Sequence, residues 1–559
     1  MASCQTYQDA KSFRRSPLLL TPLLKPLSSY LSNNFDSRAE EMKTVAVIGL
    51  GPAGLATVKE LRAIGFEVKG YDRSARVGGR WAQDPRFDTG VWKELCMNDT
   101  RRFLAYSDFE WNKEKLATRN GDIGEDYAGK YAHHTETTVY LEAYAEHFGL
   151  GPSLHLNTTV TAIERLEDNS WSVTSTTKDK ANHQETFDAL VVCSGLYSLP
   201  RNPIKDTVLK HYTGTILHSA EFKSAKDFDG KRVLVVGSSI SGAEIASVLA
   251  REGDCHKVVN SVRRVHYHAS KVSTAKGMPI DEIFWQRLPI WLNRYLPDSI
   301  TSKGMKSTVL AAYPKQLTSE MTGGMQPPDP DIRKAGLTLA VDYVETVEAG
   351  KLVVKPGLSK AEGKKITFED GSSEEFDAVV CATGYDCDLS FLPPHVQDKV
   401  CYEIPGYGAK EVALYNFTLV PDIENLAFVG ILNFVGPAFV GSEMQARYIA
   451  AVWGGKVPRA SSKQMETGVA AYKAFREAGP NNRGTLSTQV TEDLGDELGL
   501  TPSALGAIWN AKTQLVGALL PCFYRTKSTV EGPEAAREAK ELLEYYLANP
   551  DTVSTSSSA

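Results

Sequence analysis

The sequence of 559 residues has little net charge and lacks the features of nucleic-acid-binding, metal-binding and membrane-spanning proteins. Its 62 Lys and Arg residues nearly balance 68 Asp and Glu residues, so the formal net charge of −6 provides neither a basic field for nucleic acid nor an acidic tail. The eight cysteines are scattered, with no Cys-x-x-Cys pair and no zinc-site spacing, which indicates free thiols in a reducing compartment and no metal site. No apolar run reaches about 18 residues, so no transmembrane helix is expected.

The first 42 residues differ in composition from the rest of the chain. Before Asp36 they contain one acidic residue, Asp9, and four basic residues, together with frequent Ser and Leu. This composition suits an organelle transit peptide, although Pro17, Pro22 and Pro26 oppose a long amphipathic helix. Two interpretations stay open, a transit segment and a flexible leader. The expected localisation is cytoplasmic, with an organelle as the alternative.

A dinucleotide-binding signature begins at Thr44. The apolar run 45–48 predicts a strand buried on both faces, 55–64 predicts a helix, and 66–72 predicts a second strand. The turn between the first strand and the helix reads Gly49-Leu50-Gly51-Pro52-Ala53-Gly54. In such a turn the first glycine permits the tight bend, the second lets a pyrophosphate approach, and the third allows helix–strand packing. Asp72 ends the second strand, where a carboxylate can accept a hydrogen bond from a ribose hydroxyl.

A double glycine follows this unit in the segment Val77-Gly78-Gly79-Arg80-Trp81. Two adjacent glycines let the chain run close against a cofactor, which would place Arg80 and Trp81 near it. A plain turn beside a buried Trp is the alternative.

A second strand–turn–helix unit occupies 232–250, and its turn reads Gly237-Ser238-Ser239-Ile240-Ser241-Gly242. Ser239 takes the place of the middle glycine, and its small side chain still admits a diphosphate. The next predicted strand, 258–264, ends in Arg263 and Arg264 instead of an acid. These arginines favour the 2′-phosphate of NADP over NAD, with a solvated surface pair as the alternative.

Two similar stretches, 187–195 and 376–384, each follow an alternating, turn-rich segment. They predict a β-meander that returns to the main sheet twice, once on each side of the second turn. The fold class expected is α/β, with two Rossmann-like dinucleotide-binding domains, the second inserted into a discontinuous first domain, plus a mostly helical C-terminal region. The boundaries expected are 1–42 for the leader, 43–208 and 326–456 for the first domain, 209–325 for the second domain, and 457–559 for the C-terminal region with its polar tail.

Further motifs resemble those of the flavin-containing monooxygenase family, whose members contain two such domains. Residues 212–222 resemble the family fingerprint F-x-G-x-x-x-H-x-x-x-[YF], with Tyr212 in place of the first Phe and with His218 at the histidine. Phe222 stands where Baeyer–Villiger relatives carry Trp. Other similar segments are 96–100 and 106–109, 381–385, 425–430 and 443–447.

The resemblance implies an NADPH- and O₂-dependent flavoprotein monooxygenase in which the first domain binds FAD and the second binds NADPH. In that family NADPH reduces FAD, the reduced flavin adds O₂ as a C4a-hydroperoxide, and a soft nucleophile, a nitrogen or sulfur atom of a small organic substrate, takes one oxygen atom. Asn98 resembles the family's flavin-side asparagine and is the expected catalytic residue. The expected cofactor-binding residues are Gly49, Leu50, Gly51, Pro52, Ala53, Gly54, Asp72, Gly79, Arg80, Trp81, Met97, Asn98, Val160, His218, Gly237, Ser238, Ser239, Ser241, Gly242, Arg263, Arg264, Thr383 and Gly384.

Three alternatives to N- or S-oxygenation are a Baeyer–Villiger monooxygenase that oxidises a ketone, a flavin disulfide reductase, and a non-catalytic flavin or NADP sensor. The reductase needs a redox dithiol, which the cysteine spacing does not provide. The substrate pocket is expected from segments 270–330 and 457–525. His266, His268, Trp285 and Trp291 lie near the first of these, and packing is the role expected for each. Partners other than O₂ and the substrate are not expected, although a homodimer stays open.

Overall fold

The computed structural model describes residues 42–109, 111, 131–269, 271, 281, 296–327, 332–340, 342–404, 410–431, 434–477 and 485–500. The leader, Trp285, Trp291 and the part of the C-terminal region beyond residue 500 lie outside the described residues. No helix within these ranges is long and apolar enough to cross a membrane.

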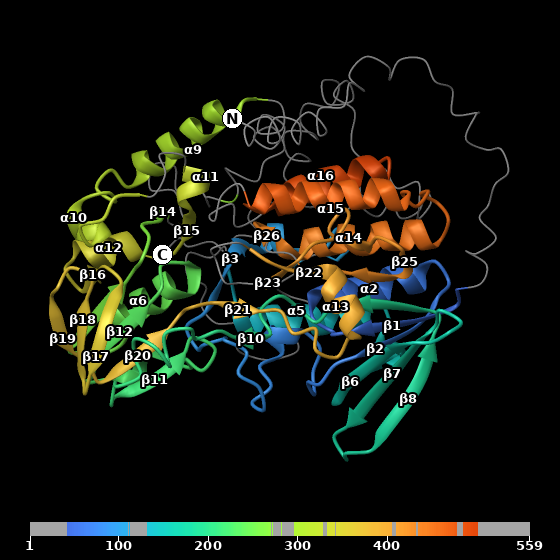
Figure 1. Cartoon of the computed structure of the whole chain (residues 1–559), viewed down its shortest axis with the longest axis horizontal. Helices are drawn as coiled ribbons and strands as arrows, with labels where there is room; N and C mark the ends of the chain where they lie inside the picture. Colours follow the sequence, from blue (N-terminus) through green and yellow to red (C-terminus); the bar gives the residue numbers. More distant parts are fainter. Residues whose placement is uncertain are drawn as a thin grey trace.

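The first lobe is built on a six-stranded sheet that is parallel except at one edge (Figure 1). In spatial order its strands are β24 (Leu419–Val420), β25 (Ile423–Phe428), β9 (Ala189–Val192), β1 (Thr44–Ile48), β2 (Glu67–Tyr71) and β5 (Leu154–His155). Strand β1 pairs with β2 and β9 and is buried along most of its length, as its unbroken apolar run predicts.

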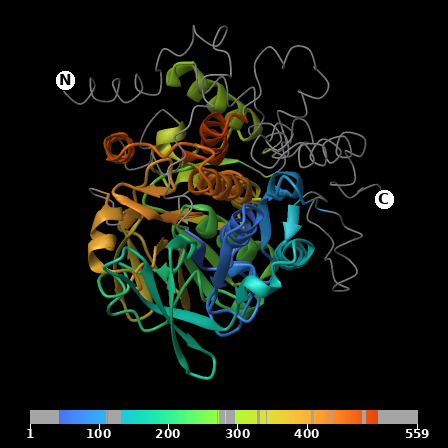
Figure 2. The ribbon, with the colours of Figure 1, turned by 90° about the vertical axis from the view of Figure 1, so that its right-hand side faces the viewer.

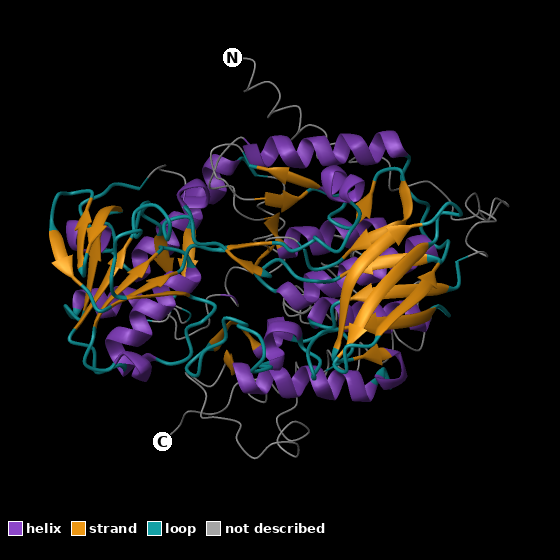
Figure 3. Ribbon diagram, turned by 60° about the horizontal axis from the view of Figure 1, so that its bottom comes forward, coloured by secondary structure: helices purple, strands orange, loops and turns teal. Residues whose placement is uncertain are grey.

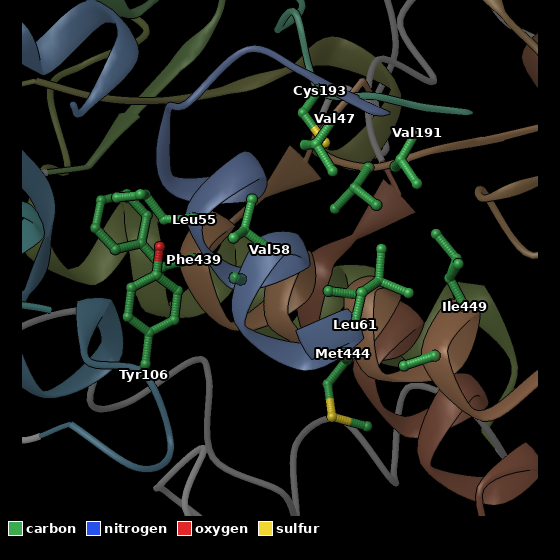
Figure 4. Close-up of a cluster of buried hydrophobic side chains, with 14 of the residues drawn as sticks. Val47, Leu55, Val58, Leu61, Tyr106, Val191, Cys193, Phe439, Met444 and Ile449 are labelled. Carbon is green, nitrogen blue, oxygen red and sulfur yellow. The ribbon is translucent and has the colours of Figure 1, made fainter. Parts of the chain in front are cut away.

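Two helices from distant parts of the sequence cover one face of this sheet. Helix α2 (Pro52–Ala63) begins with Pro52, whose fixed φ suits the first helical turn. Helix α14 (Ala438–Trp453) packs against α2, and the two lie together when the molecule is viewed from the side of this lobe (Figure 2). Their side chains form an apolar core with those of the sheet, in which the rings of Tyr106 and Phe439 stack at 5.6 Å (Figure 4).

The second lobe is built on a five-stranded parallel sheet (Figures 1 and 3). In spatial order its strands are β11 (Thr215–His218), β20 (Ala378–Cys381), β12 (Arg232–Val236), β13 (Lys257–Ser261) and β16 (Leu352–Lys355). Helix α6 (Ile240–Glu252) follows β12, so the second strand–turn–helix unit is confirmed.

The placement of the second repeated stretch corrects the sequence analysis. Residues 376–384 were expected to return to the first sheet, but β20 lies between β11 and β12 of the second sheet. The two repeats are nevertheless equivalent. Asp188 accepts hydrogen bonds from the main chain at the start of β1, and Asp377 does the same at the start of β12. Each repeat contributes an inner strand to its own sheet, β9 to the first and β20 to the second. The boundary expected at residue 325 is therefore wrong, and the second lobe continues through β20.

Strands β9 and β20 each follow a three-stranded antiparallel meander. The meanders are β6 (Thr158–Arg165), β7 (Trp171–Thr177) and β8 (Asn182–Phe187) in the first lobe, and β17 (Leu358–Glu362), β18 (Lys365–Phe368) and β19 (Ser373–Glu375) in the second. The turn at Asp370 and Gly371 joins β18 to β19, and Gly371 has a φ of +80° there.

Short elements complete the described structure. The two-stranded sheets pair β3 (Cys96–Thr100) with β4 (Tyr131–His133), β10 (Leu199–Pro200) with β21 (Tyr385–Asp386), β14 (Tyr267–Ala269) with β15 (Leu337–Leu339), β22 (Cys401–Glu403) with β23 (Lys410–Val412), and β26 (Phe434–Val435) with β27 (Thr485–Leu486). The other α-helices are α3 (Arg101–Leu104), α5 (His134–His147), α9 (Asp298–Ala312), α10 (Ser319–Thr322), α11 (Ile332–Ala335), α12 (Tyr343–Glu348), α13 (Pro394–Val400), α15 (Ser462–Glu477) and α16 (Ser487–Glu497). Three 3-10 turns are η3 (Gly79–Ala82), η5 (Gly151–Ser153) and η6 (Ala225–Phe228). The pair β10–β21 consists of the two chain segments that pass between the lobes (Figure 1).

Candidate active site

The first glycine turn connects β1 to α2, and its three glycines meet different surroundings. Gly49 has a φ of +98°, and a Cβ there would lie 2.5 Å from the carbonyl oxygen of Cys193. A Cβ on Gly54 would collide with the carbonyl oxygen of Gly49. At Gly51, by contrast, a Cβ would meet only an ordinary contact, 3.5 Å from the Cα of Gly79. The protein itself therefore leaves space for a Cβ at Gly51, and this space fits a ligand.

The start of helix α2 can bind an anion at this place. Gly51 is the N-cap residue and provides no side-chain cap, so the first amide groups of the helix receive no such hydrogen bond. Leu50 is fully buried, the Pro52 carbonyl accepts the Tyr106 hydroxyl at 2.8 Å, and the Ala53 carbonyl accepts the Thr57 hydroxyl at 2.8 Å. These contacts fix the first turn of the helix, and its uncapped amide groups fit a pyrophosphate group.

Asp72 follows β2 beside this turn. Its Oδ2 accepts the Leu50 amide at 2.7 Å and its Oδ1 accepts the Ser74 amide at 2.8 Å. Burial raises the pKa of Asp72, and the two amide hydrogen bonds act in the opposite direction. A carboxylate can accept further bonds at both oxygens, so Asp72 fits a ribose hydroxyl. Val160 lies on β6, whose first residue, Thr158, donates its amide to the Asp72 carbonyl at 2.9 Å.

The double-glycine segment contacts the first turn. Gly78 and Gly79 have φ values of +115° and +59°, a region that favours glycine. Trp81 is half-buried against the apolar cores of both lobes. The Arg80 guanidinium lies 5.3 Å from the ring of Tyr197 and 4.8 Å from that of Tyr385. Arg80 thus contacts the two segments that connect the lobes, on β21 and next to β10.

Asn98 lies in the middle of β3, after the buried Met97. The Oδ1 atom of Asn98 is buried and has no hydrogen-bond partner among the described residues. A buried acceptor without a partner is costly in a folded protein. The position therefore fits a hydrogen-bond donor that a bound cofactor supplies.

The second glycine turn repeats the geometry of the first. Gly237 has a φ of +131°, and a Cβ there would collide with the Ala382 carbonyl oxygen. A Cβ on Gly242 would collide with the carbonyl oxygen of Gly237. Ser239 is the N-cap residue of α6, is exposed, and forms no side-chain cap, while Ser238 and Ser241 are half-buried. The amides at the start of α6 are thus available to a diphosphate.

Two residues that sequence reasoning missed support this second turn. The Asn260 amide donates to the carbonyls of Val235 at 3.0 Å and Gly237 at 2.9 Å, and its oxygen accepts the Tyr343 hydroxyl at 2.8 Å. Asn260 is a buried polar residue within an apolar strand, which was a usable signal. Tyr343 is far away in the sequence and had none.

The two arginines lie two and three residues beyond the end of β13, where Arg263 is exposed and Arg264 is half-buried. His266 and His268 follow and are buried. The His266 ring contacts the Thr338 hydroxyl at 3.0 Å, and the His268 ring stacks on that of Tyr343 at 4.2 Å. Burial lowers the pKa of His268 to about 4. The packing role expected for both histidines is confirmed.

A family model for flavin-binding monooxygenase-like proteins matches residues 42–504. The chain belongs to this family. Rabbit (Oryctolagus cuniculus) flavin-containing monooxygenase 5 is 26% identical over 503 residues, covering 86% of this chain and 88% of the relative. A Macaca mulatta protein named dimethylaniline monooxygenase [N-oxide-forming] 2 is 27% identical over 471 residues, covering 82% of each chain. The S-allyl-L-cysteine S-oxygenase of Allium sativum has a similar fold, with a TM-score of 0.60 and 21% identity, and covers 90% of this chain and 99% of that chain.

The protein is therefore a flavoprotein monooxygenase, and family membership implies a flavin and NADP(H). Residues 425–430 and 443–447, which resemble segments of the family, form further contacts of the first site. Gln445 accepts the Gly430 amide at 3.0 Å, and a Cβ on Gly430 would lie 2.6 Å from the Cβ of Ala53. Glu443 accepts the Ser107 amide at 2.9 Å. These side chains of α14 position the loops that surround the start of α2.

The fingerprint histidine of this monooxygenase has a structural role. His218 accepts the Ala220 amide at Nδ1, at 3.1 Å, so Nε2 carries the proton that is donated to the Gly384 carbonyl at 3.0 Å. Burial lowers the pKa of His218, which favours this neutral form. Both ring nitrogens therefore bond to the main chain and link β11 to the segment after β20, while a contact of His218 with a cofactor stays a prediction. Thr383 also bonds to the protein, since its hydroxyl donates to the Arg201 carbonyl.

Proposed function

We propose that this flavoprotein monooxygenase uses FAD and NADPH to transfer one oxygen atom from O₂ to a nitrogen or sulfur atom of a small organic substrate. The observation that carries the proposal is the pair of open glycine turns, one at the start of α2 and one at the start of α6. The turn with Asp72 fits FAD, and the turn followed by two arginines fits NADPH.

The bound cofactors supply hydride transfer and the activation of O₂. The protein binds and orients the cofactors and excludes water from the site. The amides at the start of α2 hold the pyrophosphate of FAD, and Asp72 accepts from its ribose. Asn98 presents an amide at a buried position, where one hydrogen bond is stronger than it would be in water. The strand that carries Asn98 is largely shielded from solvent, as the buried Met97 and Thr100 show, which would keep water away from the reacting atoms.

Phe222 supports N- or S-oxygenation over Baeyer–Villiger oxidation. It is fully buried and stacks on Phe228 at 5.6 Å. A Phe at this position of the fingerprint is typical of the N- and S-oxygenating members, whereas Baeyer–Villiger relatives carry Trp. The name of the N-oxide-forming relative agrees with this choice.

A competition between three substrate types tests the proposal. The purified protein is supplied with NADPH and O₂ and with equal amounts of a thioether, a tertiary amine and a cyclic ketone, and the products are identified by mass spectrometry. Sulfoxide or N-oxide should form in proportion to the NADPH consumed. Lactone as the main product would instead establish the Baeyer–Villiger alternative, and NADPH stable in the presence of O₂ and all three substrates would contradict oxygenation.

A further inference from the structure

A buried lysine contacts the strand that carries Asn98. The side chain of Lys271 is 2% exposed, and its Nζ donates to the carbonyls of Cys96 at 3.2 Å and Met97 at 2.9 Å. Its third partner is Glu244 of α6, at 3.1 Å. The same Nζ lies 5.6 Å from the ring of Tyr131, on the strand that pairs with β3.

These contacts combine hydrogen bonds with an ion pair. Two of the three N–H donors of the ammonium group meet carbonyls of β3, and the Glu244 carboxylate lies beside Nζ as its ion-pair partner. Burial raises the pKa of Glu244, and the neighbouring Lys271 acts in the opposite direction. A buried ion pair contributes little net stability but fixes geometry, because each charge must keep its partner.

The two elements that Lys271 joins, α6 and β3, belong to different lobes. Glu244 lies two residues after Gly242, on the helix that begins at the second glycine turn. Cys96 and Met97 immediately precede Asn98 on β3. Lys271 therefore connects the helix of the NADPH site to the main chain next to the flavin-side asparagine.

We propose that Lys271 is a positioning residue for Asn98, and that its ammonium group, held by Glu244, fixes the carbonyls of Cys96 and Met97 and so sets the direction of the Asn98 side chain. This inference rests on the proposed function. A second contact on the same strand agrees with it, since Asp281 accepts the Thr100 amide at 2.6 Å, two residues after Asn98. Both β3 anchors come from the region that follows β14.

The test compares two variants that share the loss of the Glu244 charge. Glu244→Gln replaces the carboxylate by an amide whose oxygen can still accept from Nζ, so Lys271 can keep its bonds to the two carbonyls. The double variant Lys271→Met/Glu244→Gln removes these bonds. The measured quantity is the fraction of consumed NADPH that ends as hydrogen peroxide in the presence of substrate. The double variant should raise this fraction by about two- to tenfold relative to Glu244→Gln, the range expected for one lost hydrogen bond. An equal fraction in both variants would overturn the proposal.

A double-mutant cycle shows whether Lys271 acts through Asn98. If it does, adding Asn98→Ala to the Lys271→Met/Glu244→Gln variant should cause no more uncoupling than Asn98→Ala alone. Additive effects would mean that Lys271 acts elsewhere and would overturn the assignment. Ile366→Ala is the matched control for lost stability, since Ile366 is fully buried on β18 of the second meander and lies outside the predicted sites. It should lower the melting temperature and leave the hydrogen peroxide fraction unchanged.

Hydrogen exchange gives a readout that does not depend on turnover. The amides of β3 should exchange faster in the FAD-containing double variant than in Glu244→Gln, while those of β12 should not change. Unchanged exchange in β3 would contradict the positioning role of Lys271 even if the wild-type protein oxygenates no substrate. Failure of the proposed function and failure of this inference therefore remain distinguishable. If the double variant retains no FAD, Lys271→Arg keeps a cation beside Glu244 with altered donor geometry and should show the same changes.

Discussion

Gly51 and Gly79 lie so close together that a Cβ on Gly79 would come within 3.0 Å of the Cα of Gly51. The first glycine turn and the double-glycine segment thus face each other at the start of α2. Neither the fold of the turn nor its neighbours exclude a Cβ at Gly51 itself, where the nearest contact would be 3.5 Å. A substitution at Gly51 therefore tests cofactor binding separately from folding.

Gly51→Val should therefore yield a folded protein that has lost its yellow FAD. An N-cap substitution of this kind costs about 1 kcal/mol of stability, whereas a side chain at the pyrophosphate weakens FAD binding by collision. Flavin absorbance per chain and far-ultraviolet circular dichroism measure the two effects. Gly151→Val is the matched control, because a Cβ there meets nothing within 4 Å and should leave FAD bound. Full FAD occupancy in Gly51→Val would contradict the assignment of this turn.

The local parts of this architecture could be predicted from the sequence. Both glycine turns, Asp72 and the meander strand Trp171–Thr177 follow from short-range patterns, since turn geometry and burial act over a few residues. The partners of strand β20 could not be predicted in the same way. A strand buried on both faces is apolar throughout, so its side chains do not specify which neighbour it pairs with.

The supporting residues of the site were missed for a related reason. Lys271 lies 174 residues from the carbonyl of Met97, and Tyr343 lies 83 residues from Asn260. In the sequence each resembles an ordinary lysine or tyrosine, and only the folded chain shows that it is buried against a site. The family resemblance pointed to Asn98 but carried no information about what holds it.

The exposed Arg263 should select NADPH over NADH. A charge-assisted hydrogen bond to the 2′-phosphate contributes about 1.5–3 kcal/mol, so Arg263→Ala should raise KM for NADPH by about tenfold or more. KM for NADH, which lacks this phosphate, should hardly change. Steady-state kinetics with both coenzymes check this, with Arg62→Ala of α2 as a control of equal charge. An equal rise for both coenzymes would exclude Arg263 as the group that recognises the phosphate.

The buried His268 should make the protein less stable in acid. Its pKa is about 4 in the folded protein and ordinarily about 6.5, so between these values the unfolded chain binds the proton more readily. The contribution of neutral His268 is complete above about pH 6.5 and falls as the pH decreases towards about 4, with a loss of about 2 kcal/mol at pH 5.

His268→Phe keeps a ring that can stack on Tyr343 and should remove this part of the acid sensitivity. Urea unfolding at pH 7.5 and pH 5.0 measures the difference, and the exposed His256→Gln is the control. If His268→Phe and the wild-type protein lose the same stability between the two pH values, the titration of His268 does not contribute.

Asn98→Ala should separate flavin reduction from oxygen transfer. FAD should stay bound, because its pyrophosphate and ribose are held elsewhere, and anaerobic reduction by NADPH should survive. The transfer of oxygen should lose one hydrogen bond, worth about 0.5–1.5 kcal/mol, which corresponds to roughly a 2- to 13-fold increase in the wasteful decay that yields hydrogen peroxide. Peroxide and oxygenated product per NADPH are the measured quantities. Asn202→Ala is the matched control, because Asn202 also has a buried Oδ1 without a hydrogen-bond partner among the described residues but lies away from β3, next to β10. Unchanged coupling in Asn98→Ala would show that the asparagine only supports the strand, whereas uncoupling in Asn98→Ala alone would place its amide beside the reacting oxygen.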